Sequence, residues 1–245
     1  MAECETVWII GASDGIGAAL ARAWAARGAR LILSARSEDK IAAFAAELGP
    51  EHIAQPLDVS DRASLDRAAQ AISKVGPVDR VVHLAAIYDP GKISDLDPTK
   101  AENIVIVNLA GTFHVAQVAP KVLGKGGQLA LCGSVAGYMG LPQGQIYSAT
   151  KAGVINLAET LRAELAGSVD VRLINPGFVD TRLTAQNDFD MPAMVTPERA
   201  AGDIIKGLLG SSFEVHFPRR LTWPLKWLSA LPYWAALPLT SRLTR

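Results

Sequence analysis

Short apolar runs that suit buried strands alternate in this chain with longer Ala-rich segments whose apolar residues recur at helical spacing. The predicted strands are residues 6–10, 30–34, 78–84, 128–132 and 169–174. The predicted helices are residues 16–27, 40–48, 64–75, 99–118 and 145–166. Such alternation favours parallel strands joined by right-handed helical crossovers. The sequence therefore predicts an α/β fold with a doubly wound parallel sheet, whose ligand site lies beyond the carboxyl ends of the strands.

Length and charge narrow the class of protein further. A chain of 245 residues, 49% hydrophobic and 20% charged, fits one large domain with a sizeable core. Its 24 basic and 24 acidic side chains balance, so the total charge gives no reason to expect a nucleic acid partner. Cys4 and Cys132 are too few for a disulfide framework, and no His/Cys cluster has metal-ligand spacing. We expect no metal, and a cytoplasmic protein, because the first apolar run meets glycine too soon for a signal peptide.

A glycine-rich segment, GASDGIG at residues 11–17, follows the first predicted strand and opens the first predicted helix. In this context Gly11 permits a tight turn, Gly15 lets the backbone approach a pyrophosphate, and Gly17 lets the helix pack closely on the sheet. The free N–H groups at the helix N-terminus would face the anion. The segment predicts a Rossmann-type dinucleotide-binding loop, although glycines after a strand, taken alone, also suit a plain turn.

The end of the second predicted strand bears on the choice of cofactor. A carboxylate there would accept hydrogen bonds from the adenosine ribose of NAD, but Ala35 occupies that place and Arg36 follows it. A guanidinium can pair with a 2′-phosphate, so we expect NADP(H) as the cofactor. Asp14 argues mildly against this expectation, because it adds negative charge near the same phosphate. The alternative for Arg36 is a solvated surface arginine.

Three polar residues suggest a reaction. Ser134 follows a predicted strand, while Tyr147 and Lys151 lie four residues apart in a predicted helix and so share one helical face. A tyrosine hydroxyl has a pKa of about 10, but a neighbouring ammonium and a nicotinamide cation would favour the phenolate. Tyr147 is thus a candidate general acid/base, and Ser134 a candidate donor to a reacting carbonyl oxygen. Taken alone, a Tyr-x-x-x-Lys pair is more often a pair on a helix surface.

In order and spacing, these motifs and the Pro-Gly pair at residues 176–177 resemble the short-chain dehydrogenase/reductase family over about residues 5–217. The resemblance implies an oxidoreductase that moves a hydride between nicotinamide and a carbonyl or secondary alcohol. It also implies that Tyr147 donates the proton in reduction, that Lys151 also binds the nicotinamide ribose, and that Ser134 orients the substrate. A further family asparagine, which supports a proton relay through water, matches Asn108.

The resemblance also implies contacts along the whole dinucleotide. Asp58 resembles the residue that touches the adenine, and Thr181 the residue beside the nicotinamide end. The expected cofactor-binding residues are Gly11, Ser13, Gly15, Ile16, Gly17, Arg36, Asp58, Val59, Ala85, Ala86, Tyr147, Lys151, Pro176, Gly177, Val179 and Thr181.

The chain departs from the family at residues 83–86, where His-Leu-Ala-Ala replaces the common Asn-Asn-Ala-Gly and two amide side chains are therefore absent. We interpret His83 as a packed strand histidine and not as a base. We interpret Cys132 as a buried strand thiol and not as a nucleophile.

An apolar small molecule is the expected substrate. The loop at residues 182–195 is predicted to cover it, and the apolar residues expected near it are Phe189, Met191, Met194, Tyr138 and Met139. Family members usually pair through the helices that contain Asn108 and Tyr147, so a homodimer or homotetramer is expected. A non-catalytic NADP(H)-binding sensor or scaffold protein is the alternative function, and it would not need the complete set of Ser134, Tyr147 and Lys151.

A Trp- and Pro-rich extension, residues 218–245, follows the last predicted strand at 213–217 and the expected catalytic domain at 1–217. Prolines and Lys226 interrupt its apolar run, which argues against a transmembrane span. Short helices are predicted after Thr222 and Leu231, each with a proline in its first turn. Residues 213–245 carry five basic side chains and one acidic one, whereas the preceding 212 residues carry 19 and 23. Three roles stay open: a cover for the substrate cleft or a subunit interface, peripheral contact with the inner face of a membrane, or a partner protein.

Overall fold

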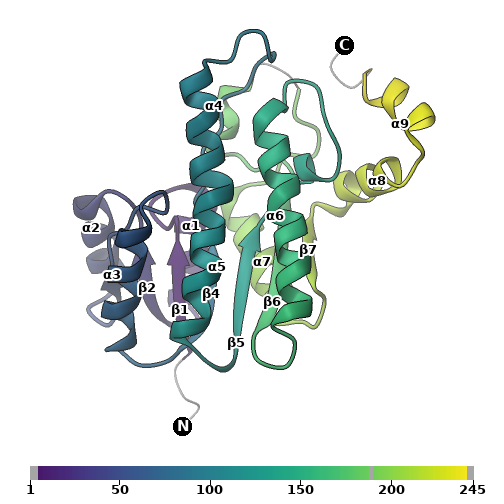
Figure 1. Ribbon diagram of the computed structural model, residues 1–245. Coiled ribbons are helices and arrows are strands. Elements are labelled where there is room, and N and C mark those ends of the chain that lie inside the picture. Colours follow the sequence, from purple (N-terminus) through teal and green to yellow (C-terminus); the bar gives the residue numbers. More distant parts are fainter. Residues whose placement is uncertain (1–4, 188–189, 242–245) are drawn as a thin grey trace.

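A seven-stranded parallel sheet forms the centre of the molecule (Figure 1). The computed structural model describes residues 5–187 and 190–241. The strands are β1 (Thr6–Ile10), β2 (Arg30–Ser34), β3 (Ile53–Ala54), β4 (Val78–His83), β5 (Leu123–Cys132), β6 (Asp170–Pro176) and β7 (Glu214–Phe217). They run in the order β3-β2-β1-β4-β5-β6-β7, and every pairing is parallel. This order confirms the doubly wound fold and places its reversal between β1 and β4, where such folds bind ligands.

Helices cover both faces of the sheet. They are α1 (Gly15–Ala25), α2 (Glu38–Leu48), α3 (Arg62–Ser73), α4 (Pro98–Val105), α5 (Gly111–Val122), α6 (Gln145–Glu164), α7 (Pro197–Leu208), α8 (Arg219–Ser229) and α9 (Tyr233–Thr240). The core forms two clusters, one under α1, α2 and α7 and the other under α3, α5 and α6. Side chains of β1 alternate between the two clusters, with Trp8 and Ile10 in one and Val7 and Ile9 in the other. Burial on both faces explains why the strands read as continuous apolar runs.

Helix α7 is an element that the sequence interpretation missed. It has a clear start signal, since Thr196 caps it by accepting a hydrogen bond from the N–H of Arg199 and Pro197 occupies its first turn. Its buried residues lie at helical spacing: Ala200, Ala201, Ile204, Ile205 and Leu208. They pack into the core beside α1.

The predicted helix at 99–118 is also more complex than expected. It consists of α4, a π-helical turn at Ile106–Ala110, and α5. The extra residue in such a turn rotates the side chains that follow it, and π-turns of this kind often occur at functional sites. Asn108 lies within this one.

In its described part, residues 218–241, the C-terminal extension forms two helices that project from the body beside β7 (Figure 1). The predicted start of the first, after Thr222, was wrong: Pro218 adopts an extended conformation at the N-cap, so α8 begins at Arg219 and Pro224 lies inside it. The second helix, α9, begins after Leu231 as predicted, with Pro232 at its N-cap. Within the ranges that the structure describes, we find no helix with both the length and the apolar character needed to cross a bilayer.

Candidate active site

A cavity of about 760 Å³ lies beyond the carboxyl ends of the central strands, at the point where the strand order reverses. Its volume falls within the range of small-molecule sites. Its walls include every residue expected to bind the cofactor, from Gly11 to Thr181, together with Ser134. Among the expected catalytic and cofactor-binding residues, only Asn108 lies off these walls. Residues that are far apart in the sequence are thus brought together by the sheet topology.

The glycine loop packs so closely against neighbouring backbone that Gly11 and Gly17 have no room for a side chain. Gly11 has a φ of +91°, and a Cβ there would lie 2.6 Å from the backbone nitrogen of Ala85. A Cβ on Gly17 would lie 2.0 Å from the carbonyl oxygen of Gly11. The close approach that Gly17 permits is therefore to the loop at the end of β1. Gly15 has a φ of +51°, and a Cβ there would lie 3.0 Å from Cγ2 of Thr181.

Two arginines bear on the charge at this loop. Asp14 caps α1 by accepting a 2.7 Å hydrogen bond from the N–H of Gly15, and its other oxygen lies 3.2 Å from Nε of Arg182. The negative charge of Asp14, which argued mildly against NADP(H), is thus paired with Arg182. Arg36 is exposed just beyond β2, on the cavity wall.

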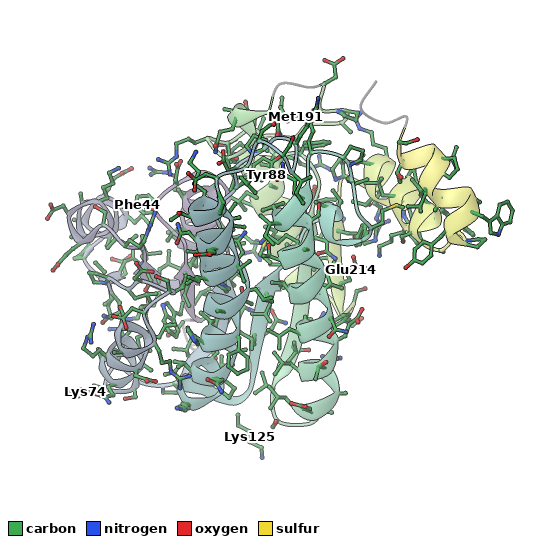
Figure 2. The ribbon with its side chains drawn as sticks, turned by 45° about the horizontal axis from the view of Figure 1, so that its top comes forward. Phe44, Lys74, Tyr88, Lys125, Met191 and Glu214 are labelled. Atoms are coloured by element: carbon green, nitrogen blue, oxygen red, sulfur yellow. The ribbon has the colours of Figure 1, made fainter. Side chains whose placement is uncertain are left out.

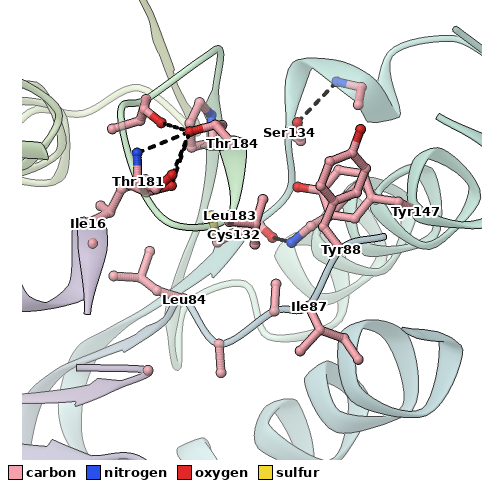
Figure 3. A pocket seen from close by; sticks show the side chains of 18 of the residues that line it. Ile16, Leu84, Ile87, Tyr88, Cys132, Ser134, Tyr147, Thr181, Leu183 and Thr184 are labelled. Carbon is pink, nitrogen blue, oxygen red and sulfur yellow. Dashed lines mark hydrogen bonds between the residues drawn. The ribbon is translucent and has the colours of Figure 1, made fainter. Parts of the chain in front are cut away.

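Ser134, Tyr147 and Lys151 all line the cavity, and Figure 3 shows Ser134 and Tyr147 on the same side of it. Nζ of Lys151 donates a 2.8 Å hydrogen bond to the carbonyl oxygen of Cys132 and lies 5.7 Å from the ring centroid of Tyr147. Oγ of Ser134 accepts a hydrogen bond from the N–H of Ala136 and so caps the short helix that follows β5. Burial raises the pKa of Tyr147, while a hydrogen bond with Ser134 acts in the opposite direction. Burial lowers the pKa of Lys151.

Asn108 supports the site from behind. Its Oδ1 accepts a 2.8 Å hydrogen bond from the N–H of Ile87, and its Nδ2 donates one of 2.8 Å to the carbonyl oxygen of the same residue. Nδ2 also lies 3.4 Å from Oγ1 of Thr150 on α6. The amide thus holds the segment after β4 in place, and its expected part in a water relay stays a prediction.

His83 is packed in the sheet as predicted, whereas Cys132 is only partly buried and lines the cavity, so its predicted lack of a nucleophilic role stays a prediction. His83 is buried in β4, with Nε2 3.1 Å from Oγ1 of Thr112. Burial lowers the pKa of His83 to about 3, so the ring is neutral and packed. Burial also raises the pKa of the Cys132 thiol, which disfavours the nucleophilic thiolate.

Comparison with known proteins agrees with this geometry, since the sequence profile of the short chain dehydrogenase family matches residues 5–192. The chain belongs to the short-chain dehydrogenase family. A sorbitol dehydrogenase of Cereibacter sphaeroides is 34% identical over 181 residues, 72% of this chain and 71% of the relative. A short chain dehydrogenase from Burkholderia cenocepacia, solved with NADP, is 24% identical with a TM-score of 0.84 over 99% of both chains. One from Burkholderia phymatum, solved with NAD, is 22% identical with a TM-score of 0.83, covering 91% of this chain and 92% of the other.

Several side chains at the cavity of this short-chain dehydrogenase were not predicted from the sequence, and Tyr88 is one of them. The ring of Tyr88 meets that of Tyr147 edge to face, with centroids 4.7 Å apart (Figure 3). Its hydroxyl donates a 2.9 Å hydrogen bond to Oδ1 of Asn187 in the loop at 182–195. Tyr88 follows β4 at the ligand-binding edge of the sheet, and this position was the only signal in the sequence.

The residues that form the apolar wall of the cavity differ from those that were expected. Much of the loop at 182–195 lines the cavity, but Met191, Met194, Tyr138 and Met139 do not, and Phe189 lies outside the described residues. The apolar wall includes Leu183, Ile87, Leu141, Leu221 and Leu225. The last two belong to α8, so the C-terminal extension takes part in the cavity of this oxidoreductase.

Proposed function

We propose that this chain is an NADP(H)-dependent oxidoreductase that transfers a hydride between nicotinamide and a carbonyl or secondary alcohol of an apolar small molecule. The observation that carries the proposal is that Ser134, Tyr147 and Lys151 all line a cavity that the glycine loop also lines. A non-catalytic sensor or scaffold would not need the first three residues there.

The residues of the cavity fit a nicotinamide dinucleotide. Gly11 and Gly17 let the glycine loop adopt its close fold, because a Cβ at either position would collide with the backbone of Ala85 or of Gly11. The N-terminus of α1, which follows this loop, is suited to a pyrophosphate. When bound, the cofactor supplies or accepts the hydride. Lys151 would hold the nicotinamide ribose, and Thr181 would lie at the nicotinamide end. Asp58 and Val59 would hold the adenine end.

Arg36 is the basis for proposing NADP(H) in preference to NAD(H). Its guanidinium is suited to a 2′-phosphate, and the pairing of Asp14 with Arg182 reduces the repulsion that such a phosphate would meet. We expect NADPH to bind at least about tenfold tighter than NADH in a fluorescence titration. Equal affinities would contradict the assignment, and Arg36→Ala should bring the two affinities together.

The mechanism follows from three side chains. Ser134 would donate a hydrogen bond to the substrate oxygen, which polarises the carbonyl and holds it near Tyr147. Because burial raises the pKa of Tyr147, its hydroxyl keeps the proton that reduction requires and delivers it to that oxygen. The ammonium of Lys151, fixed by the carbonyl of Cys132, supports the phenolate that is left.

The proposed substrate class and the proposed oligomeric state are supported by different surfaces of the molecule. Leucines 183, 221 and 225 make part of the cavity apolar, which supports an apolar substrate. A homodimer or homotetramer is supported by Ile106 and Phe113, which are exposed along the helix that contains Asn108.

The direct test is Tyr147→Phe, assayed by NADPH absorbance against a panel of carbonyls and alcohols. We expect nearly all turnover to be lost while NADPH binding, followed by fluorescence, is unchanged. Tyr233→Phe is the matched control, because Tyr233 is 81% exposed on α9 and outside the cavity. Retained turnover in Tyr147→Phe would overturn the mechanism. NADPH binding without turnover of any compound by the native protein would favour the sensor or scaffold.

A further inference from the structure

The two C-terminal helices carry an unusual concentration of exposed apolar side chains. We call residues 219–240 the arm. Its exposed large hydrophobic residues are Trp223, Trp227, Leu231, Tyr233, Trp234, Leu237 and Leu239. Trp227 is 72% exposed, and Tyr233 and Trp234 are each 81% exposed. Surface this apolar marks an interaction site on a soluble domain.

The orientation of α8 is fixed by polar contacts with β7. Oγ1 of the buried Thr222 lies 2.6 Å from Nδ1 of His216, and Lys226 forms an ion pair with Glu214. Leu221 and Leu225, four residues apart, face the cavity. Trp223 and Trp227 lie two residues further along and are left exposed on another face. The outward direction of these indoles is therefore a property of the fold.

The charge of the extension is of one sign. Residues 218–245 contain five basic residues and no acidic one, whereas residues 1–217 contain 19 basic and 24 acidic residues. Arg219 and Arg220, at the start of α8, are exposed and form no ion pair within the described residues. Trp223 and Trp227 follow Arg219 at four-residue spacing, so cationic and aromatic side chains share one stripe of the helix.

We propose that the arm binds an anionic lipid surface, with Trp227, Tyr233 and Trp234 at headgroup depth and Arg219 and Arg220 on the anionic groups. Indole and phenol rings combine an apolar body with a polar edge and therefore favour the membrane interface. Basic residues near the surface add attraction to anionic lipid. The proposal concerns a surface outside the cavity and does not depend on the hydride chemistry.

A second copy of the chain suits the arm less well. Two arms facing each other would bring together Arg219 and Arg220 of both copies without an anion, because the arm has no acidic residue and Lys226 is already paired with Glu214. The body, in turn, offers no apolar surface of similar extent in the part of the chain that is described. Its exposed large hydrophobic residues are Ile93, Ile106, Phe113, Met194 and Leu209, which come from two loops, the α4–α5 helix and the end of α7.

The apolar contribution is tested by flotation of the full-length protein with phosphatidylglycerol–phosphatidylcholine vesicles. We expect the native protein to float with them and the Trp227→Ser/Trp234→Ser variant to stay behind. Ile93→Ser/Leu209→Ser is the matched control, because it also removes two exposed apolar residues and should float normally. Thermal unfolding checks that the variants fold, and Trp234→Ser alone is the fallback if the double variant does not. Flotation of the Trp variants equal to that of the native protein would overturn the proposal.

The electrostatic contribution is tested with Arg219→Gln/Arg220→Gln. We expect its partition coefficient to fall about 30-fold, the change that two basic residues at about 1 kcal/mol each produce, and we expect added salt to weaken native binding. Lys74→Gln/Lys125→Gln is the control, because these lysines lie at the opposite end of the molecule (Figure 2). An equal fall in the partition coefficient of the control variant would contradict the assignment of the lipid contact to the arm.

Light scattering after size-exclusion chromatography separates the lipid from a second copy. We expect the Trp227→Ser/Trp234→Ser variant to keep the native molar mass. A lower mass for this variant, without vesicle binding by the native protein, would assign the arm to a subunit interface and overturn the proposal. Absence of vesicle binding with unchanged mass would overturn it in favour of a partner protein.

Discussion

The hydroxyl of Tyr138 donates a 2.5 Å hydrogen bond to Oε1 of Glu214 and thereby joins the segment after β5 to the last strand of the sheet. The same carboxylate accepts a 2.7 Å hydrogen bond from Nδ2 of Asn175 and forms an ion pair with Lys226 of α8. Tyr138 directly follows the short helix that Ser134 caps. Glu214 therefore connects the turn that carries Ser134 with the C-terminal helix that lines the cavity.

Glu214→Gln should reduce both stability and turnover. It keeps the shape of the side chain but removes the charge that Lys226 and Tyr138 contact. We expect a loss of about 1–3 kcal/mol in the free energy of unfolding, measured in urea. We also expect kcat to fall about 10-fold with little change in KM, a fraction of the about 100-fold that a 1 Å misplacement can cost. Glu47→Gln is the control, because its pair with Arg22 is exposed, so the substitution should change stability and kcat little. Normal kcat in a destabilised Glu214→Gln variant would separate Glu214 from the Ser134 turn.

The contact between Tyr88 and Asn187 predicts an effect on substrate affinity. It joins the segment after β4 to the loop at 182–195, and Tyr88→Phe removes it while keeping the ring against Tyr147. We expect KM for the substrate to rise about 2- to 10-fold, as the loss of one neutral hydrogen bond implies, with kcat nearly unchanged. Asn187→Ala should have the same effect, and the double variant should add little to either single change. Full additivity would show that the two side chains act separately.

Two glycine-to-alanine substitutions are expected to have opposite effects on stability. A Cβ on Gly17 collides with the carbonyl oxygen of Gly11 at 2.0 Å, so Gly17→Ala should cost about 1–3 kcal/mol and weaken NADPH binding. Gly202 lies inside α7 with nothing within 4 Å of its ideal Cβ. Gly202→Ala should therefore stabilise the protein by up to about 1 kcal/mol and leave NADPH binding alone. Urea unfolding and a fluorescence titration measure both, and a stabilised Gly17→Ala variant would contradict the close packing of the loop.

Local sequence patterns were enough to predict much of the fold and of the candidate site. The β-strands are buried on both faces, so their apolar runs stand out, and the ends of parallel strands must share one edge. That rule brings Gly11, Arg36 and Ser134 to one cavity although they are far apart in the sequence.

Other features depend on interactions that no local pattern records. The π-turn around Asn108 is favoured by a hydrogen-bonded pair with the backbone of Ile87, 21 residues away. Glu214 meets Tyr138 across 76 residues. The start of α8 was misplaced because Pro224 was taken as a first-turn proline, whereas Pro218 fills the N-cap position. Helix α7 is different, since Thr196 and Pro197 mark its start in the sequence.

Asp170 predicts a dependence of stability on acid pH. Burial alone would raise the pKa of this carboxyl, but hydrogen bonds from Arg172, Gln128 and Arg162 outweigh that effect and lower it to about 2. An unfolded aspartate has a pKa of about 3.9. Because the folded pKa is the lower one, the carboxylate stabilises the fold at pH values above about 4, and this contribution is lost as the pH falls toward about 2.

Asp170→Asn removes the titrating group and is the test of this dependence. We expect the variant to be less stable than the native protein at pH 7, and we expect the difference to shrink as the pH is lowered from about 4 to about 2. Asp66→Asn is the control, because the pair that Asp66 forms with Arg62 is exposed, so its effect should stay small at every pH. Urea unfolding at a series of pH values measures both variants. A constant difference between the native protein and Asp170→Asn would mean that the arginines do not hold this carboxylate more tightly in the folded chain than in the unfolded one.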